Sequence, residues 1–376
     1  MTRFLIFYFV AYGGAHIYLF LKLKRAFSLS LKGKLLCTSF LVTLFIAPLI
    51  ARNLESHNLD RFAEILSYSG YLWMGMLFLF LSAAATLDIF NLVCFKTGIK
   101  ISPKSLFLTA GAYTVVIGIY GYYEARNVVT EHLTIKSHKI SVEVERIRIV
   151  QISDVHLGQV VRESRIKAIV ALIKAASPDI LVSTGDLVDG HQKHFSGLES
   201  FLLEIKPKLG KYAVLGNHEY YAGIVESEKF TRAAGFKLLN NQTFELGGLI
   251  SITGVDDSRD EAAQSSNAII EAKLLKHAAK SEFRLLLKHR PIVEKTSEDS
   301  FDLQLSGHVH KGQIFPFNLL TWLSFPVRTG LTIMENGSFL YVSRGTGVWG
   351  PPIRFLAPPE ITVIDLIPEN GITKKN

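Results

Sequence analysis

Cysteine is nearly absent from this chain, which has two among 376 residues. Cys37 and Cys94 both lie in strongly apolar stretches, and none follows. A disulfide framework, a cysteine zinc site and a cysteine nucleophile are therefore excluded from everything after residue 94. Any metal site there has to use nitrogen and oxygen ligands.

Acidic residues are scarce in the first 123 residues, which hold 4 Asp and Glu against 11 Lys and Arg. Only +1 of the net charge of +8 therefore belongs to the remainder of the chain. The basic residues flank apolar runs and do not form a separate basic region. We therefore expect no nucleic-acid binding.

Long apolar runs dominate the same first 123 residues. The first run would be about 27 Å long as a helix at ~1.5 Å per residue, close to the thickness of a bilayer core. A cleaved signal peptide is the alternative for this run, but no small-x-small cleavage site follows it and further runs come next. We expect an all-α membrane anchor of about four helices, at residues 4–21, 35–50, 68–95 and 105–123.

The connections between these runs differ in charge. The first and third connections together carry eight basic residues, and the second carries two. The eight are Lys22, Lys24, Arg25, Lys32 and Lys34 in the first connection and Lys96, Lys100 and Lys104 in the third. The two in the second connection are Arg52 and Arg61. Basic loops stay in the cytoplasm, so the segment after residue 123 is expected on the extracytoplasmic side of a plasma or inner membrane.

The central stretch of the chain is Ile147 to Leu157, an apolar and β-branched run that ends in Ser153, Asp154 and His156. A buried strand of this kind delivers polar side chains to the carboxyl edge of a sheet. Strand alternation would place Asp154 and His156 on one side. Such a pair is half of a site for a borderline divalent metal, or simply a polar loop.

The same event occurs five times along the chain: an apolar run ends, and Asp, Asn or His follows within a few residues. Two divalent ions at ~3.5–4 Å repel each other, so a shared carboxylate and several further ligands are needed to hold them. Neutral Asn and His add ligands without cancelling the charge of the metals. The five endings are Asp154 with His156, Asp186, Asn217 with His218, His289, and His308 with His310.

Together these motifs resemble those of the calcineurin-like metallophosphoesterases, over roughly residues 148–366. Asn217-His218-Glu219-Tyr220-Tyr221 and the segment from Gly307 to Gln313 are similar to the bacterial membrane-associated branch of that superfamily. Val309 and Lys311 depart from that branch, at positions that are not metal ligands. The resemblance implies a four-layer α/β/β/α sandwich in residues 147–376, after a linker and edge strand in residues 124–146.

The resemblance also implies a centre of two divalent ions, Mn, Fe, Zn or Co. Asp186 would bridge the ions and His218 would stabilise or protonate the phosphate, while an activated water attacks phosphorus. The implied metal ligands are Asp154, His156, Asp186 and His310 for the first ion, and Asp186, Asn217, His289 and His308 for the second. Lys311, Arg259 and His191 are candidates for substrate contact, although surface roles are as common for the last two.

An apolar segment follows His310 directly. It is too interrupted by Pro316 and Pro326 to span a bilayer, so it is either core or a lip that enters the membrane interface. We expect the lip. Its candidate membrane-contact residues are Phe315, Phe317, Trp322 and Phe325.

The sequence thus predicts a membrane-anchored hydrolase of a phosphomonoester or phosphodiester, with the lipid bilayer as partner and a lipid-linked or envelope-linked substrate. A soluble nucleotide or phosphoprotein substrate is the alternative. A membrane protein that binds metal without catalysis is a second alternative, disfavoured by the intact ligand set. A transporter is disfavoured by the small number of spans and buried charges.

Overall fold

The computed structural model describes residues 8–56, 60–257, 261–277 and 282–369. It divides into a helical unit and a sheet-containing unit. The first comprises residues 1–123 and 350–355, and the second comprises residues 124–349 and 356–376.

The helical unit contains the apolar first third of the chain. Its elements are η1 (Tyr8–Tyr12), α2 (Gly13–Ala26), α3 (Leu31–Ser56), α4 (Asp60–Lys96) and α5 (Pro103–Glu124). Three stretches are long and apolar enough to cross a membrane, 31–51, 61–96 and 103–124. The predicted first span, residues 4–21, begins outside the described residues and continues through η1 and α2. The number of spans therefore stays a prediction.

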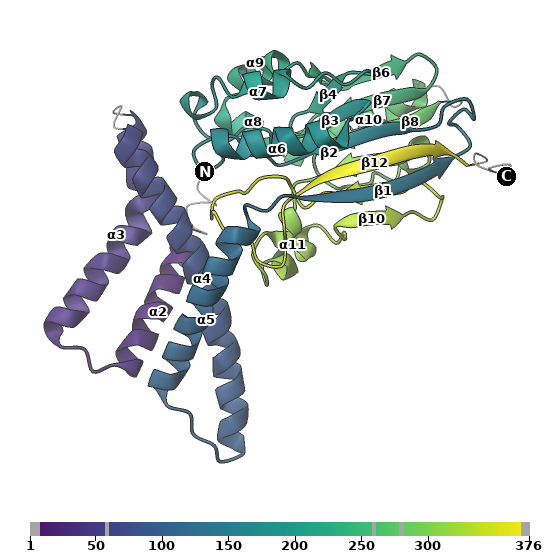
Figure 1. Ribbon diagram of the computed structural model, residues 1–376. Helices are drawn as coiled ribbons and strands as arrows, with labels where there is room; N and C mark the ends of the chain where they lie inside the picture. The colour runs from purple at the N-terminus through teal and green to yellow at the C-terminus, as the bar shows by residue number, and fades with distance from the viewer. Residues whose placement is uncertain (1–7, 57–59, 258–260, 278–281, 370–376) are drawn as a thin grey trace. The chain divides into compact units, whose positions relative to one another are not determined.

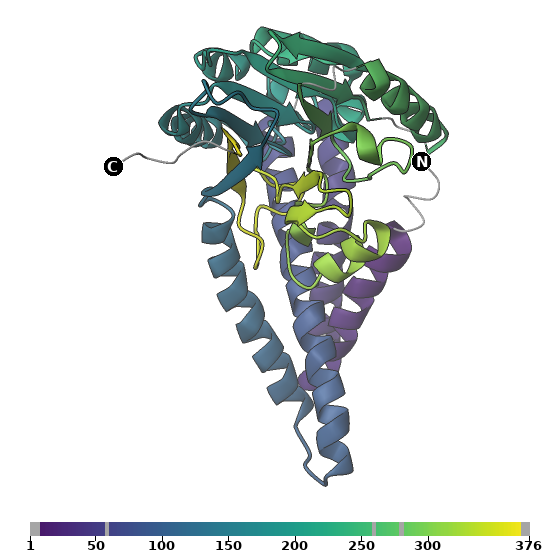
Figure 2. The ribbon, with the colours of Figure 1, turned by 90° about the vertical axis from the view of Figure 1, so that its right-hand side faces the viewer.

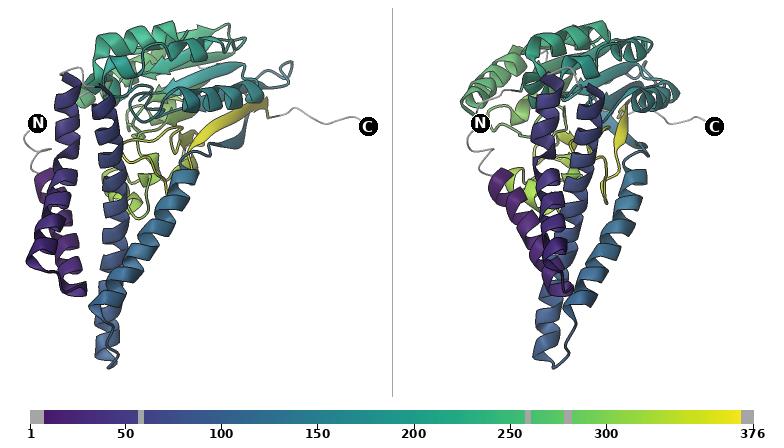
Figure 3. Two further views of the ribbon diagram at one scale, coloured as in Figure 1. Left: turned by 60° about the vertical axis from the view of Figure 1, so that its left-hand side comes forward. Right: turned by 90° about the vertical axis from the view of Figure 1, so that its left-hand side faces the viewer.

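Polar contacts connect α2 to α4 within this unit. The indole Nε1 of Trp73 donates to Nε2 of His16 at 2.9 Å. The Asp88 carboxylate accepts from the Tyr18 hydroxyl at 2.7 Å and pairs with Lys22. Helices α3 and α4 also contact each other, and their ribbons can be followed in Figure 3. These polar side chains are satisfied by one another, which favours a structural role for them.

Residues 350–355 join the helical unit through close contacts with two helices. The Arg354 amide donates to the Gly121 carbonyl at 2.9 Å, where a β-carbon would not fit. Likewise a β-carbon at Gly75 would lie 2.8 Å from Ile353 Cδ1. Glycine in α4 and α5 thus lets this segment approach their backbones.

The second unit is built on two six-stranded sheets. In the first sheet the order is β1 (Val129–Ser137), β12 (Glu360–Pro368), β2 (Ile147–Ile152), β3 (Ile180–Thr184), β4 (Lys211–Val214) and β5 (Lys237–Leu238). In the second it is β10 (Gly330–Ile333), β11 (Phe339–Val342), β9 (Leu303–Ser306), β8 (Phe283–Lys288), β7 (Ile250–Val255) and β6 (Gln242–Leu246). Strands β2 to β5 are parallel, as are β7, β8, β9 and β11.

Helices cover the outer face of each sheet (Figure 1). On the first sheet these are α6 (Glu163–Ala176), η2 (Gln192–His194), α7 (Glu199–Leu203), α8 (Asn217–Ala222) and α9 (Ile224–Ala233). On the second sheet lie α10 (Glu261–His277) and η3 (Glu298–Ser300), whereas η4 (His310–Gly312) and α11 (Asn318–Ser324) follow the carboxyl end of β9. The predicted four-layer α/β/β/α sandwich is confirmed.

Burial explains the order of the layers. One core lies between the sheets, where Val182 and Ile252 meet from opposite sides. A second lies between the first sheet and its helices, and includes Ile166 and Ile169 of α6. A third joins Leu275 of α10 to Leu286 of β8. Strands that bury both faces read as continuous apolar runs, which is the pattern of β2, β3 and β8.

The two sheets also join where their parallel strands end. Gln151 Nε2, at the end of β2, donates to Thr184 Oγ1 at 2.8 Å and across to the Ser306 carbonyl at 3.1 Å. The Ser306 carbonyl belongs to the second sheet, and Thr184 ends β3 in the first. The carboxyl ends of strands from both sheets therefore face one space.

Candidate metal centre

Five strand endings supply the polar side chains of this space. Asp154 and His156 follow β2, Asp186 and Asp189 follow β3, Asn217 and His218 follow β4 at the start of α8, His289 follows β8, and His308 and His310 follow β9. The first three endings belong to one sheet and the last two to the other. Neither sheet alone contains the whole set.

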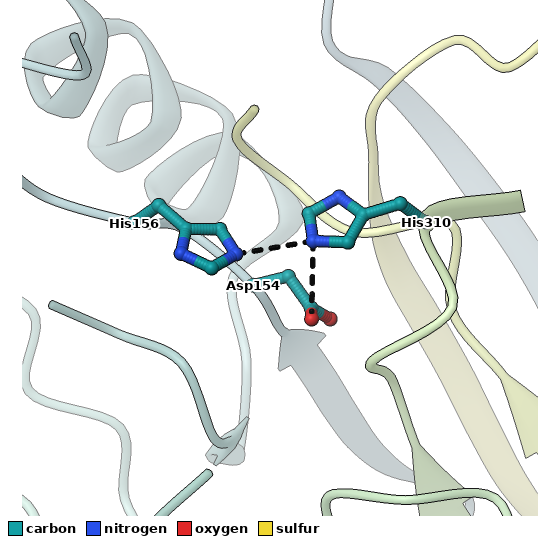
Figure 4. Close-up of side chains that lie close together, drawn as sticks. All are labelled: Asp154, His156 and His310. Atoms are coloured by element: carbon teal, nitrogen blue, oxygen red, sulfur yellow. Dashed lines mark hydrogen bonds and ion pairs between the residues drawn. The ribbon is translucent and has the colours of Figure 1, made fainter. Parts of the chain in front are cut away.

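One cluster consists of Asp154, His156 and His310 (Figure 4). The Nε2 atoms of His156 and His310 are 3.0 Å apart, and His310 Nε2 is 3.4 Å from Asp154 Oδ1. All three side chains are buried. Two imidazole nitrogens and a carboxylate oxygen facing one point match the ligand preferences of zinc, iron and manganese.

A second cluster consists of Asp186, His289 and His308. His289 Nε2 is 3.1 Å from both Asp186 Oδ2 and His308 Nδ1. The same Asp186 Oδ2 is 3.9 Å from His156 Nε2 of the first cluster. Asp186 thus lies between the clusters, as a carboxylate shared by two metal ions must.

Asn217 is buried at the start of α8, and its side-chain oxygen Oδ1 has no hydrogen-bond partner among the described residues. A buried amide oxygen without a partner is costly. Coordination of a cation would satisfy it. The donor set of imidazoles, carboxylates and one amide oxygen therefore fits divalent ions.

The histidine orientations are fixed from outside the clusters. His289 Nδ1 donates to the Thr184 carbonyl at 2.9 Å, which leaves Nε2 as the ligand atom. Asp154 accepts the Ser153 hydroxyl at 2.5 Å and the His308 amide at 2.9 Å. These contacts hold the ligand atoms in place before any ion binds.

The backbone at the site adopts an uncommon conformation. Positive φ angles of 47–72° occur at Asp154, His156, Asp186, His308 and His310. Each such non-glycine residue costs about 1–3 kcal/mol, and such residues cluster at functional sites. Since β2 ends at Ile152, Asp154 and His156 meet their partners through these turns. The expected strand alternation does not place them.

The charges in the site favour cations. Burial would lower the pKa of His289, but the Asp186 and Asp154 carboxylates raise it to about 10. Burial would raise the pKa of Asp186, yet positive charge on His289 and His218 holds it well below its usual range. Carboxylates that draw protons this strongly onto imidazoles would also attract a divalent ion.

His218 lies beside the first cluster and pairs with Asp189. Its Nδ1 donates to Asp189 Oδ1 at 2.9 Å. Burial would lower the pKa of His218, but the Asp186 and Asp189 carboxylates outweigh it and raise the pKa to about 9. The rings of Tyr221 and Trp349 pack edge-on against His218, at 5.3 and 5.8 Å between centroids. Asp189 and the two rings thereby hold the His218 imidazole beside the first cluster.

The Glu219 carboxylate accepts hydrogen bonds from the backbone of two turns that carry ligand residues. Its Oε1 accepts the amides of Leu187 and Val188 at 2.6 and 3.1 Å, and its Oε2 accepts those of Asp186 and Gly216 at 3.0 and 2.7 Å. The side chain is fully buried, and this burial, with the charge of Asp186, raises the pKa of Glu219 to about 7. One carboxylate thus shapes both turns that carry ligands.

We expect Glu219→Gln to destabilise the protein by about 2–6 kcal/mol, because the amide NH2 would face two backbone donors that then lose their acceptor. Urea unfolding of the full chain in detergent measures this. Glu163→Gln, on the exposed face of α6 beside Lys167, is the matched control and should change stability by under about 0.5 kcal/mol. Equal effects of both changes would contradict the role of Glu219.

The structure does not bring the three predicted substrate residues into one cluster among the described residues. Lys311 adjoins His310, is half-buried and has a φ of 52°. His191 is exposed, and its Nδ1 accepts the Lys193 amide at 3.4 Å. Arg259 lies outside the described residues. Substrate contact by these three side chains stays a prediction.

Sequence reasoning missed two carboxylates and one carbonyl. Asp189 pairs with His218, Glu219 holds two turns, and the Thr184 carbonyl orients His289. The position of Asp189, three residues after Asp186, was a signal that could have indicated a second acid in the same loop. The backbone roles of Glu219 and Thr184 leave no signal in the sequence.

Several known proteins are similar to this chain in sequence. A family model described as calcineurin-like phosphoesterase matches residues 147–312. An uncharacterized metallophosphoesterase of Aquifex aeolicus is 38% identical over 67% of this chain and 97% of its own length. The metallophosphoesterase YkuE of Bacillus subtilis is 34% identical over 70% and 95% of the two chains. A zebrafish (Danio rerio) protein named transmembrane protein with metallophosphoesterase domain is 30% identical over 67% and 61%.

The residues that the family model matches include every member of both ligand clusters, and the apolar helices agree with membrane association. The implied divalent-metal chemistry fits the donor set at the strand ends. The chain therefore belongs to the calcineurin-like metallophosphoesterase family and is a metal-dependent phosphohydrolase with an N-terminal region of apolar helices.

Proposed function

We propose that this protein holds two divalent metal ions and hydrolyses a phosphomonoester or phosphodiester at the membrane. The observation that carries the proposal is the position of Asp186 between two ligand clusters, 3.1 Å from His289 on one side and 3.9 Å from His156 on the other. In this proposal Asp154, His156 and His310 hold one ion, and Asn217, His289 and His308 hold the other.

When bound, the ions would supply Lewis acidity to the phosphoryl group and to an attacking water. The chain's own residues do the rest. His218 keeps a proton on Nε2, because Nδ1 is engaged by Asp189 and the raised pKa of about 9 favours the charged ring. That proton can pass to the leaving oxygen, and the positive ring stabilises charge on the phosphate.

The substrate in this proposal carries an apolar part. Exposed aromatic side chains, among them Trp349 and Tyr221, stand beside His218 and would contact the group attached to the phosphate. Family membership alone does not select a lipid or envelope-linked ester over a soluble one. The aromatic rim and the apolar helices of the chain favour the former.

We place the phosphoesterase unit outside the cytoplasm. Lys22, Lys24 and Arg25 precede the candidate span of residues 31–51, and Lys32 and Lys34 lie at its start. Lys96 ends the candidate span of residues 61–96, Lys100 lies in the connection that follows, and Lys104 lies at the start of the span of residues 103–124. Both basic groups fall on one side of the membrane whether or not residues 4–21 form a further span. The positive-inside rule then puts the last helix end, and the unit that follows, on the opposite side.

Hydrolysis by the full chain in detergent tests the proposal. After metal removal and Mn²⁺ addition we expect turnover of p-nitrophenyl phosphate or its bis ester, and we expect His218→Ala to lower kcat by about 10²–10⁴-fold. His277→Ala, at an exposed histidine ending α10, is the matched control and should leave kcat unchanged.

Two metals bound without turnover of either ester or of a phospholipid would favour the non-catalytic alternative. Turnover limited to soluble nucleotides would replace the lipid substrate with the soluble class. Retention of kcat in His218→Ala would remove this residue from the mechanism.

A further inference from the structure

Helix α11 exposes a group of large apolar side chains beside the metal centre. We define the α11 face as Leu319, Leu320, Trp322 and Leu323. Trp322 is 58% exposed and Leu323 is 72% exposed, and α11 buries none of its residues. By contrast, α6 buries five residues against the first sheet. Figure 2 shows the light-green helix α11 outside both sheets. A contiguous apolar surface of this kind marks an interaction site.

The sequence around the α11 face is basic. From Lys311 to Met334 the chain carries two cations, Lys311 and Arg328, and no Asp or Glu. Arg328 is exposed and Lys311 is half-buried. Apolar and aromatic side chains combined with basic residues suit the headgroup layer of an anionic bilayer. A protein partner of acidic character would leave the aromatic residues without a matching surface.

The α11 face is joined to the ligands of the proposed second metal ion. Phe325, just after α11, packs its ring against that of His308, with 4.9 Å between centroids. Phe325 is half-buried in a small core with Val309 and Leu340, so we leave it out of the face. Before α11, His310 of the other cluster lies in η4, which contacts the helix. A molecule bound to the α11 face would therefore be separated from the metal ligands only by residues such as Phe325 and those of η4.

The chain itself brings a bilayer within reach. Helix α5, a candidate span, ends at Glu124, and β1 begins at Val129. The four residues 125–128 can extend over about 14 Å at most, at ~3.6 Å per residue. A unit tethered this closely to a membrane meets lipid at a far higher local concentration than any soluble partner.

We propose that the α11 face inserts into the lipid headgroup and upper acyl region of the membrane in which the chain is anchored. Leu320, Trp322 and Leu323 would be the inserted side chains, and Lys311 and Arg328 would contact anionic headgroups. The inference rests on the proposed function in one respect: the contact lets a lipid-linked phosphate reach the metal centre while its acyl part stays in the bilayer. The predicted lip residues Phe315 and Phe317, 42% and 38% exposed, flank this face.

Fluorescence quenching in vesicles tests the contact without any need for turnover. The full chain with Cys37→Ala and Cys94→Ala receives a single cysteine at Leu323, labelled with bimane, and is placed in vesicles of equal phosphatidylcholine and phosphatidylglycerol. Lipids with a nitroxide on the upper acyl chain should quench this label several-fold more than one at Ile269 of α10. Ile269 is a matched control because it is also apolar and is 74% exposed.

Iodide in the water phase should quench the label at position 269 more than the label at position 323. Equal lipid quenching at both positions would overturn the proposal, as would strong iodide quenching at position 323. Shielding of position 323 from both quenchers would also overturn it, because a protein surface would then cover the face.

Turnover gives a second measure. Leu320→Ser with Leu323→Ser should lower hydrolysis of a phospholipid in vesicles by about tenfold and leave a soluble nitrophenyl ester unaffected, since each leucine loses its favourable transfer to lipid. Ile269→Ser is the control. Lipid quenching without phospholipid hydrolysis would reject the lipid substrate of the proposed function and retain the contact. Hydrolysis without quenching would reject the contact alone.

Discussion

Replacement of Asp186 by Asn is expected to lower phosphoester hydrolysis by about 10³-fold and bound metal from two ions per chain to one or none. The Asp186 carboxylate is buried and lies 3.1 Å from His289 and 3.9 Å from His156. An amide keeps its size but removes the negative charge that would offset the two proposed cations. Repulsion between those ions would then no longer be compensated.

Metal content after dialysis and kcat of the same sample measure this effect. Asp299→Asn is the matched control, since Asp299 is exposed and its side chain accepts from Asn336 at 3.0 Å. It should change neither quantity. Asp186→Asn with two retained ions and kcat within tenfold of the unchanged protein would contradict a shared carboxylate.

The second large effect is expected from Gly307→Ala. Gly307 follows β9, and a β-carbon there would overlap Ser153 Oγ and Asp154 Oδ2. Asp154 is fixed by Ser153 and by the His308 amide, so it cannot move aside without breaking these contacts. One methyl group should therefore displace a metal ligand, lower kcat by about 10²-fold and destabilise the fold by about 1–3 kcal/mol.

Thermal unfolding and metal affinity are measured for Gly307→Ala and for a control. The comparison separates the steric effect of the new β-carbon on Asp154 from the loss of backbone freedom that any replaced glycine causes. Gly197→Ala is the control, because its β-carbon meets nothing within 4 Å and its φ of 89° adds only backbone strain of about 1 kcal/mol. The control should lose some stability and keep full activity. If Gly307→Ala binds metal as tightly as the control does, close approach at Gly307 is not what places Asp154.

Both predictions depend on turns between strands and not on the strands themselves. The strand endings were visible in the sequence because buried parallel strands read as apolar runs. His289 follows β8 directly, and Asp186 follows β3 after one glycine. The conformation of the turns was not visible. Asp154 and His156 were expected to share a side through strand alternation, but both lie beyond β2 with φ near 52°. Left-handed residues of this kind are set by surrounding contacts.

The same limit applies to the supporting residues. Glu219 was part of a recognised motif, yet its four backbone donors come from the turns after β3 and β4. Asp189 orients His218 across a gap of 29 residues in the chain. Such pairs form only when separate loops fold against each other, and a single sequence carries no record of that proximity.

The sequence by itself determined the apolar helices and the residue types that compose the candidate centre, because hydropathy and ligand chemistry are local properties of the chain. The fold class was implied by the resemblance of its motifs to a known family. Only the tertiary structure decided how the ligand side chains meet in space. His156 meets His310, and Asp186 meets His289, across two sheets. The reason is physical: contacts between sheets depend on how the inner faces pack, and that packing is a property of the whole unit.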